Sequence, residues 1–234
     1  MGPVRDRRQR NTRVSGGLVS AQHESLSGLH DVAFPEWDND PPREPFELLS
    51  RWLDEAEQQG CAEPRGAAVS TVDESFSLSS RMMTMVELTA RGPVFATHTT
   101  SRKAHDIRAT QSGSALFYWR EIGRQLLVAG TFERVDEQKS ESLWSNRHPA
   151  LHPMSSLSRQ SEVLTDPTAL RDRVRLLEVE ASQRPAPIAR PLRYVGYELC
   201  GTHVEFWSSA SDRLHRRLLY KWSGGQWCIR RLQP

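Results

Sequence analysis

The sequence lacks the cysteine patterns that build metal sites or disulfide frameworks. Its 234 residues include only three cysteines, at positions 61, 200 and 228, and no CxxC pair. We therefore predict neither a zinc site nor disulfides, and we expect a reducing cytoplasm as the location. His148 and His152 have the spacing of a helical metal pair, but prolines interrupt the stretch and no acidic or thiol partner is close, so we predict no metal.

Long apolar runs and a strong net charge are also absent. No run of about 18 apolar residues occurs, so no transmembrane helix is expected, and the start of the chain has no apolar segment typical of a secretory signal. The formal net charge is only +2, which predicts no nucleic acid or other polyanion as a partner.

Glycine-rich and serine-centred motifs of common enzyme classes are missing as well. The sequence contains no GxGxxG, no GxxxxGK[ST] and no GxSxG. A nucleotide cofactor would therefore have to be held by side chains and not by a glycine-rich loop. A serine hydrolase of the nucleophile-elbow type is not predicted.

The patterned part of the chain is dominated by short, β-rich apolar segments, which favour a barrel or sandwich over a parallel sheet. We predict strands at 66–73, 81–88, 93–98, 114–121, 125–135, 194–200, 203–209, 216–222 and 226–232. Capping residues and periodicity predict helices at 45–59, 136–147 and 166–182. Ser223-Gly224-Gly225 is predicted to turn the last hairpin. The order predicts one domain, a mainly β (α+β) barrel with peripheral helices.

The first 33 residues differ in composition from this pattern. Five arginines lie among residues 5–13, followed by Ser, Gly and His without periodicity. The charge is compatible with a nucleic-acid-binding arm, but a disordered tail or an over-long start is the simpler interpretation. We place the folded domain at 34–234.

The stretch FATHTTSRKAHDI at 95–107 indicates an anion site. Four hydroxyl residues precede Arg102 and Lys103 at a point where a strand gives way to a helix-compatible run. Arginine offers a planar fork to phosphate oxygens, lysine a point charge, and hydroxyls complete the shell. A solvated cationic loop is the alternative for this segment taken alone.

Several blocks, taken in order, resemble the pyridoxamine 5′-phosphate oxidase family of FMN-binding split barrels. They are Arg81-Met82-Met83, VFATHTTSRKAHDI, LFYWRE-IGRQLLVAG, SRQSE at 158–162, VEFW at 204–207, RLHRRLLY at 213–220 and the terminal RLQP. The resemblance covers residues 34–234. It implies an FMN-binding split β-barrel and a homodimer with FMN at the subunit interface, in which residues 192–234 form the C-terminal strands of the dimerisation region.

Carried over position by position, the resemblance implies a set of FMN contacts. They are Arg81, Met82, Met83, Thr84, Met85, Val86, Ala96, Thr97, Arg102, Lys103, Gln125, Gln160, Ser161, Trp207 and Arg217. The four cations in this set suit a phosphate dianion, and Gln125 and Gln160 offer amides to the isoalloxazine edge. Ala96 departs from a family position that is often aromatic, which leaves a backbone contact there.

The substrate positions depart from those of the vitamin B6 enzymes. Family members that oxidise phosphorylated B6 vitamers hold the phosphate with a Lys, a Tyr, an Arg and a Ser. The corresponding residues here are Val86, Leu143, Arg147 and Leu151. Three aliphatic side chains cannot offset the desolvation of a phosphate, so we predict that a phosphorylated vitamer is not the substrate.

The blocks LFYWRE, HPMSSLSRQSE and YELC-x3-VEFW are similar to the phenazine-biosynthesis flavin oxidases, a branch of this family. That branch implies oxidation of a partly reduced phenazine-1,6-dicarboxylate, with dioxygen as acceptor and hydrogen peroxide as product. Arg147, Arg213, Leu214 and His215 are expected to meet the substrate, with Arg213 and His215 as the catalytic candidates. His215 could accept a proton or only bind a carboxylate.

Two alternatives remain open for the function. One is a pyridoxine/pyridoxamine 5′-phosphate oxidase, which would share the flavin contacts. The other is a split barrel that binds a flavin or another ligand without catalysis. Oxygen consumption with each class of substrate distinguishes the three.

Overall fold

The computed structural model of the protein describes residues 31–183 and 186–234. Most of the predicted N-terminal tail therefore lies outside the described residues. Its last three residues are packed against the barrel: the carbonyl of Val32 accepts a hydrogen bond from Arg216 (2.9 Å), and that of Ala33 accepts one from Arg124 (3.1 Å). Residues 32 and 33, just before the predicted start of the domain at residue 34, thus contact the barrel.

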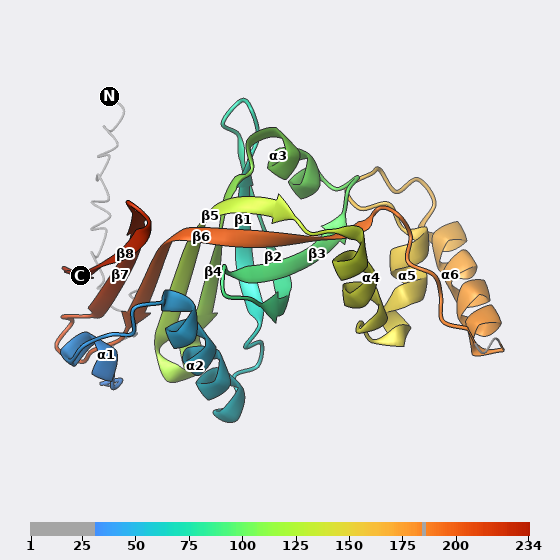
Figure 1. Ribbon diagram of the computed structural model, residues 1–234. Helices are drawn as coiled ribbons and strands as arrows, with labels where there is room; N and C mark the ends of the chain where they lie inside the picture. The colour runs from blue at the N-terminus through green and yellow to red at the C-terminus, as the bar shows by residue number, and fades with distance from the viewer. Residues whose placement is uncertain (1–30, 184–185) are drawn as a thin grey trace, which may run out of the picture.

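Eight antiparallel strands form one sheet that closes on itself (Figure 1). They are β1 (Gly66–Val72), β2 (Leu78–Leu88), β3 (Pro93–His98), β4 (Ser112–Trp119), β5 (Arg124–Arg134), β6 (Tyr194–Ser208), β7 (Arg216–Ser223) and β8 (Gln226–Leu232). The strand order is β3-β2-β1-β4-β5-β6-β7-β8, and β3 also pairs with β6. This extra pairing closes six strands into a barrel, while β7 and β8 continue the sheet beyond β6. The predicted mainly β barrel is confirmed.

The two strands predicted at 194–200 and 203–209 are one continuous strand, β6. The separation that the sequence indicates at Gly201-Thr202 is an irregularity in the ladder, where the register between β5 and β6 shifts next to Gly130. A Cβ on Gly130 would lie 2.0 Å from the carbonyl oxygen of Cys200, so the close approach of the two strands requires glycine there. The predicted final turn is confirmed, with Gly224 and Gly225 at positive φ.

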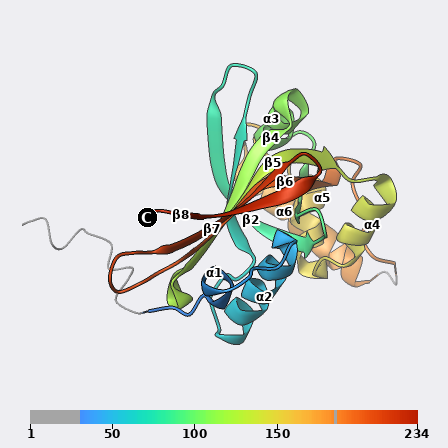
Figure 2. The same cartoon turned by 60° about the vertical axis from the view of Figure 1, so that its left-hand side comes forward.

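Helices cover the barrel from several sides. They are α1 (Pro35–Asp38), α2 (Pro45–Gln58), α3 (Arg102–Thr110), α4 (Glu137–Ser145), α5 (His152–Leu157) and α6 (Pro167–Ser182), with short 3-10 helices η2 (Arg120–Ile122) and η3 (Pro149–Leu151). Figures 1 and 2 show α4, α5 and α6 grouped on one side of the barrel and α1 and α2 on another. No helix in the described ranges has the length and apolarity needed to span a membrane.

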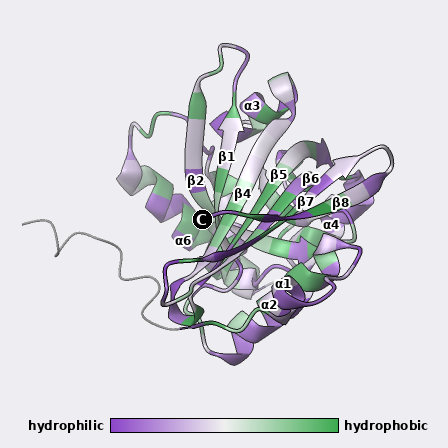
Figure 3. Ribbon diagram, turned by 90° about the vertical axis from the view of Figure 1, so that its left-hand side faces the viewer, coloured by the Kyte–Doolittle hydropathy of each residue, from purple (hydrophilic) through white to green (hydrophobic). Residues whose placement is uncertain are grey.

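The main core fills the barrel and extends beneath α2. Inward residues of the strands alternate with outward ones, as in β1, where Ala67, Val69 and Thr71 are buried. Figure 3 shows the hydropathy of these strands from the side. Trp52 of α2 packs edge-on against Phe206 of β6, with ring centroids 5.0 Å apart. The periodic apolar face predicted for this helix is thus the face that it buries.

A second, smaller core lies between the α4–α5 side and strands β3 and β6. It comprises Val94, Leu143, Trp144 and Tyr194. The end of β3 brings His98 beside it, with the ring centroid 6.3 Å from that of Tyr194. His98 is only 1% exposed, and neither ring nitrogen has a hydrogen-bond partner among the described residues. Burial, together with Arg193, Arg147 and Lys103, lowers the pKa of His98 to about 4.

We predict that His98 makes the fold sensitive to acid. Because its pKa is lowered in the fold, the unfolded chain binds a proton below about pH 6.5 while the folded chain does so only near pH 4, so stability falls as the pH falls through this window. At pH 5 the loss is about 2 kcal/mol, at 1.36 kcal/mol per unit. Between pH 7.5 and pH 5, His98→Asn should lose about 2 kcal/mol less stability than the wild type loses. Urea denaturation at the two pH values measures this difference.

The matched control is His105→Asn, because His105 lies exposed on α3. This variant should keep the acid sensitivity of the wild type. If His98→Asn and the wild type lose the same stability between pH 7.5 and pH 5, the assignment is wrong.

Candidate functional site

A cavity of about 560 Å³ opens between β2, the end of β3, the start of α3 and the segment after α4. Its lining is Arg81, Met82, Met83, Thr84, Met85, Val86, Glu87, Ala96, Thr97, Lys103, Leu143, Asn146, Arg147, Leu151, Gln160 and Tyr194. Thirteen of these sixteen residues belong to the predicted FMN or substrate contacts. Segments far apart in the sequence therefore meet at one cavity, as the anion-site hypothesis for residues 95–107 requires.

Two cations form the polar end of the cavity. Arg81 donates hydrogen bonds to the hydroxyl oxygens of Thr71 (2.9 Å) and Ser79, and Lys103 donates one to Thr97 Oγ1 (3.3 Å). Burial lowers the pKa of both groups, and the charge of Arg81 lowers the pKa of Lys103 further. Two partly desolvated cations that disfavour each other are stabilised by an anion between them. The local chemistry therefore suits a phosphate.

The hydroxyl residues before Arg102 hold the turn into α3. Ser101 is fully buried and caps the helix by accepting a hydrogen bond from the backbone N–H of Ala104 (3.3 Å). Thr97 bonds Ser101 (3.2 Å) and donates to the side-chain carbonyl of Gln160 (2.9 Å). The backbone N–H of Arg102 donates to Ser161 Oγ (3.1 Å). The SRQSE block is thereby held against the start of α3.

Arg102 points away from this cavity. Its guanidinium reaches Ser77 Oγ (3.4 Å) and lines a separate hollow together with Asp73 and Glu74. The sequence predicted that Arg102 and Lys103 act together, but two successive residues at a helix start project in different directions. Of these two residues, Lys103 lines the cavity and Arg102 does not.

The other wall of the cavity contains one cation and mostly apolar groups. Leu143 is buried, and Val86 and Leu151 are 42% and 51% exposed. The Arg147 guanidinium lies 5.5 Å from the centroid of the Tyr194 ring, and its buried Nε has no hydrogen-bond partner in the described part of the chain. Arg147 is thus available to a ligand in the cavity.

The remaining predicted residues form a second group on β5, β6 and β7. Gln125, Trp207 and Arg217 are paired neighbours in the sheet. Arg217 is ion-paired with Glu205 (2.6 Å), which raises its pKa. The ring of His215 lies 4.8 Å from that of Trp207. None of these residues lines the cavity, so one chain keeps the predicted contacts in two separate groups.

The segment that carries the catalytic candidates precedes β7. Arg213 is exposed and adopts a positive φ of 69°, and Leu214 is 54% exposed. The backbone N–H of Ala210 donates to Nδ1 of His215 (3.2 Å). Nδ1 is therefore an acceptor, and the neutral ring carries its proton on Nε2. His215 consequently presents an N–H donor on its other side.

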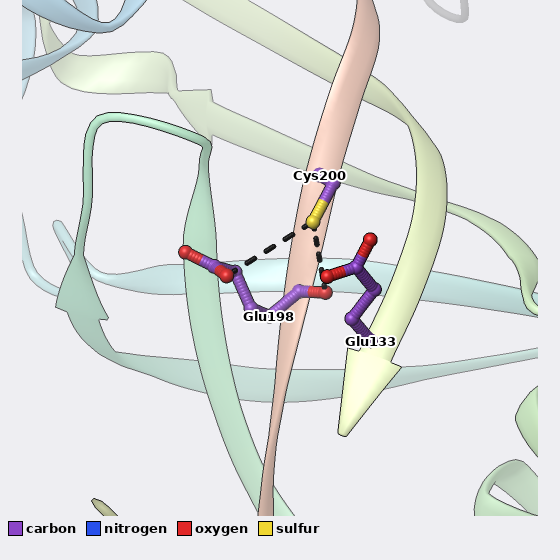
Figure 4. Close-up of side chains that lie close together, drawn as sticks. All are labelled: Glu133, Glu198 and Cys200. Atoms are coloured by element: carbon purple, nitrogen blue, oxygen red, sulfur yellow. Dashed lines mark hydrogen bonds between the residues drawn. The ribbon is translucent and has the colours of Figure 1, made fainter. Parts of the chain in front are cut away.

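The cluster of Glu133, Glu198 and Cys200 (Figure 4) has the residue types of a metal site. Arg91 already neutralises both carboxylates, with 2.6 Å between its Nη2 and the carboxylate of Glu133. Burial raises the pKa of the Cys200 thiol to about 11, so the thiol stays protonated and is a poor ligand. We assign this cluster as an ion-paired contact between strands.

His148 and His152, the pair with the spacing of a helical metal site, both contact neighbouring residues. His148 accepts a hydrogen bond from the backbone N–H of Ala150 (3.3 Å). His152 stacks on Trp144 with ring centroids 4.2 Å apart. Each ring is thus engaged by its own neighbourhood.

Sequence reasoning missed three residues that line the cavity. Glu87 continues β2, and Asn146 directly precedes Arg147, so both could have been included by extending the assigned segments. Tyr194 begins β6 and lies almost fifty residues after Arg147 in the sequence. No local pattern marks it, because the pairing of β6 with β3 brings it to the cavity.

The family models and the relatives that match this chain agree on one enzyme family. Residues 53–179 match the family model for pyridoxamine 5′-phosphate oxidase, and residues 194–234 match that for the pyridoxine 5′-phosphate oxidase C-terminal dimerisation region. The chain is 41% identical to a dihydrophenazinedicarboxylate synthase of Burkholderia lata over 93% of this chain and 100% of that protein. It is 34% identical to a pyridoxine/pyridoxamine 5′-phosphate oxidase of Caulobacter vibrioides, over 82% and 85% of the two chains.

Solved structures confirm the split-barrel fold. PhzG from Burkholderia lata, in complex with tetrahydrophenazine-1-carboxylic acid, superposes with a TM-score of 0.83 at 42% identity, covering 88% of this chain and all of that one. A pyridoxamine 5′-phosphate oxidase-related FMN-binding protein of Nostoc punctiforme has a TM-score of 0.65 at 15% identity, over 80% and 96% of the chains, and supports the fold alone. The chain therefore belongs to the pyridoxamine 5′-phosphate oxidase family of FMN-dependent oxidoreductases.

Proposed function

We propose that this protein is an FMN-dependent oxidase of phenazine biosynthesis that oxidises partly reduced phenazine-1,6-dicarboxylates toward the aromatic phenazine. The observation that carries the proposal is the wall of the cavity, where Val86, Leu143 and Leu151 stand beside Arg147. Such a wall suits a flat, largely apolar ligand with a carboxylate. The 41% identity to a dihydrophenazinedicarboxylate synthase supports the same substrate class.

The polar end of the cavity fits the phosphate of FMN. Arg81 and Lys103 would supply charge, and the side-chain N–H groups of Gln160, whose carbonyl accepts from Thr97, would add neutral donors. Bound FMN would supply the two-electron oxidation of the substrate, with dioxygen as the final acceptor and hydrogen peroxide as the product. The chain has no glycine-rich dinucleotide motif that would favour FAD or NAD.

We infer a homodimer in which each flavin site combines both groups of residues. Gln125, Trp207 and Arg217 would then complete the cavity of the other subunit. The outer face of the sheet supports this, because Met82, Ala68, Leu116 and Leu127 follow one another in register across β2, β1, β4 and β5. Met82 is 69% exposed and the other three residues are partly exposed, so this apolar row can contact a second copy. The matched dimerisation region at 194–234 includes Trp207 and Arg217.

The side chains around the substrate would act by binding and orientation. Arg147 would hold one carboxylate, and Tyr194 and Leu143 would support the ring system. Arg213 and His215 of the second copy would meet the substrate from the other side. Because Nδ1 of His215 accepts a hydrogen bond, its Nε2–H is suited to bind a carboxylate, which favours that role over proton acceptance. Gain of aromaticity drives the reaction, so alignment is the main requirement.

We predict that FMN binding depends on Lys103, the cation at the start of α3 that lines the cavity. The variant Lys103→Ala should bind FMN at least about tenfold more weakly, because one charge-assisted bond contributes about 1.5–3 kcal/mol. Flavin fluorescence quenching measures the affinity, and riboflavin, which lacks the phosphate, should bind both proteins equally. Arg108→Ala, an exposed change on the same helix, is the control. Unchanged FMN affinity in Lys103→Ala would contradict the assignment.

We predict that a charge in the outer apolar row separates the subunits. Leu127→Glu should convert the dimer into a monomer and abolish FMN retention, because burying an unpaired carboxylate at an interface costs several kcal/mol. Light scattering coupled to size exclusion measures the mass. Leu176→Glu, which adds the same charge to the exposed side of α6, should remain dimeric. A monomeric wild type that retains FMN would refute the shared site.

We predict that the wild type oxidises a reduced phenazine carboxylate and gives only trace oxidation of pyridoxine 5′-phosphate. Three charge-assisted donors are missing from the phosphate position, each worth about 1.5–3 kcal/mol, so recognition should be weaker by at least three orders of magnitude. Parallel oxygen-consumption assays measure both activities. Efficient oxidation of pyridoxine 5′-phosphate would instead support the alternative function, a vitamin B6 oxidase. The chain is 34% identical to one such oxidase.

The converse variant is Val86→Lys, Leu143→Tyr, Leu151→Ser. It should gain activity toward pyridoxine 5′-phosphate and lose phenazine turnover. Retention of FMN by the variant is the control for folding. If it retains FMN and shows no gain, these positions do not decide between the substrates.

A further inference from the structure

A buried carboxylate stands behind the cations of the cavity. Asp106 lies on α3 one turn after Lys103 and is only 4% exposed. Its Oδ2 accepts hydrogen bonds from Thr71 Oγ1 (2.7 Å) on β1 and from Ser79 Oγ (2.9 Å) on β2. Asp106 does not line the cavity, so it cannot contact a ligand there.

The two hydroxyls connect Asp106 to Arg81. Thr71 Oγ1 accepts from Nη1 of Arg81 (2.9 Å), and Ser79 Oγ accepts from Nη2. A carboxylate can only accept hydrogen bonds, so each hydroxyl must direct its proton toward Asp106 and its lone pairs toward Arg81. The carboxylate thereby fixes the orientation of both hydroxyls. Their lone pairs in turn fix the plane of the guanidinium.

Asp106 also balances the charge of the site. Lys103 interacts electrostatically with Arg81 on β2, with Asp106 on the same helix and with His98 of β3. Arg81 also interacts with Arg102. Without an anion in the cavity, the cations are partly desolvated and repel one another. Asp106 favours the protonated form of Lys103, against burial and Arg81, which both lower the pKa of that lysine.

We propose that Asp106 is a positioning residue for the flavin phosphate: through Thr71 and Ser79 it aligns Arg81, and its negative charge balances the charges of Arg81 and Lys103. The inference rests on the proposed binding of FMN at this cavity. It assigns two functions to α3. The same helical face that carries Lys103 to the ligand carries the counter-charge that holds the ligand-binding cations in place.

The test is Asp106→Asn, which keeps the size of the side chain and removes its charge. FMN should bind about tenfold more weakly at pH 8, whereas riboflavin affinity stays at the wild-type value. FMN affinity falls as Lys103 deprotonates at high pH, and the variant should show this fall at a lower pH than the wild type, because the charge of Asp106 raises the pKa of Lys103. Glu74→Gln, which removes an exposed charge beside Arg102, should match the wild type throughout.

The possible outcomes separate the two proposals. If the wild type takes up no FMN, the proposed function is overturned and the role of Asp106 with it. If the wild type binds FMN and Asp106→Asn has the same affinity and alkaline midpoint, the role of Asp106 alone is overturned. An equal loss of riboflavin and FMN binding would show a merely structural role and would also overturn it.

A second variant covers the case in which Asp106→Asn does not fold. Ser79→Ala removes one hydroxyl at a half-buried position and leaves the carboxylate in place. FMN affinity should fall about fivefold, on the scale of one lost hydrogen bond of about 1 kcal/mol, while the alkaline midpoint stays unchanged because the charge remains. Wild-type FMN affinity in Ser79→Ala would overturn the relay from Asp106 to Arg81.

Discussion

The convergence of two partly buried cations, Arg81 and Lys103, is the constraint on which the rest of this site depends. Desolvation and mutual repulsion both disfavour their charged forms. A fold that brings them together must supply acceptors around them. The barrel does so with hydroxyls from β1, β2 and β3, and α3 adds the carboxylate of Asp106. Polar side chains from four elements therefore meet at one end of the cavity.

This constraint also explains why the anion segment is rich in hydroxyl residues. Thr97 and Ser101 also stabilise the local fold. They hydrogen-bond each other, Ser101 caps α3, and Thr97 donates a hydrogen bond to Gln160. Removing either would loosen the turn that directs Lys103 into the cavity. Binding chemistry and local folding therefore depend on the same side chains. A ligand that enters finds donors whose positions have been fixed by the fold.

Much of the fold was predictable from local patterns, and the failures have identifiable causes. Pro45 marked the start of α2, Asp136 that of α4, and Asp166 with Pro167 that of α6, and β-rich segments marked most strands. The single strand β6 was predicted as two because Gly201 interrupts the pattern, whereas the structure absorbs it in a register shift beside Gly130. Periodicity cannot distinguish a bulge from a break when the neighbouring strand is unknown.

The candidate site divides in the same way. Residues 81–86, Lys103 and the wall positions meet at the cavity as the family resemblance implied. Arg102 points elsewhere, which depends on the helical direction at one residue and is not visible in a motif. Tyr194 and Asp106 were missed because strand pairing and helix packing bring them to the site. Contacts of that kind follow from tertiary structure and leave no local signal.

The two ends of the cavity differ in how freely they can change. At the cation end, Thr97, Ser101 and Asp106 are buried and hydrogen-bonded to several elements, so a substitution there leaves unpaired polar groups that cost about 1–3 kcal/mol each. At the wall, Val86 and Leu151 are about half exposed and make no hydrogen bond through their side chains, so exchanging them costs the fold little. A family built on this barrel can therefore keep one cofactor and still change its substrate. Under the proposed function, the apolar wall of this cavity would exclude a phosphorylated substrate while the cation end would still hold the flavin phosphate.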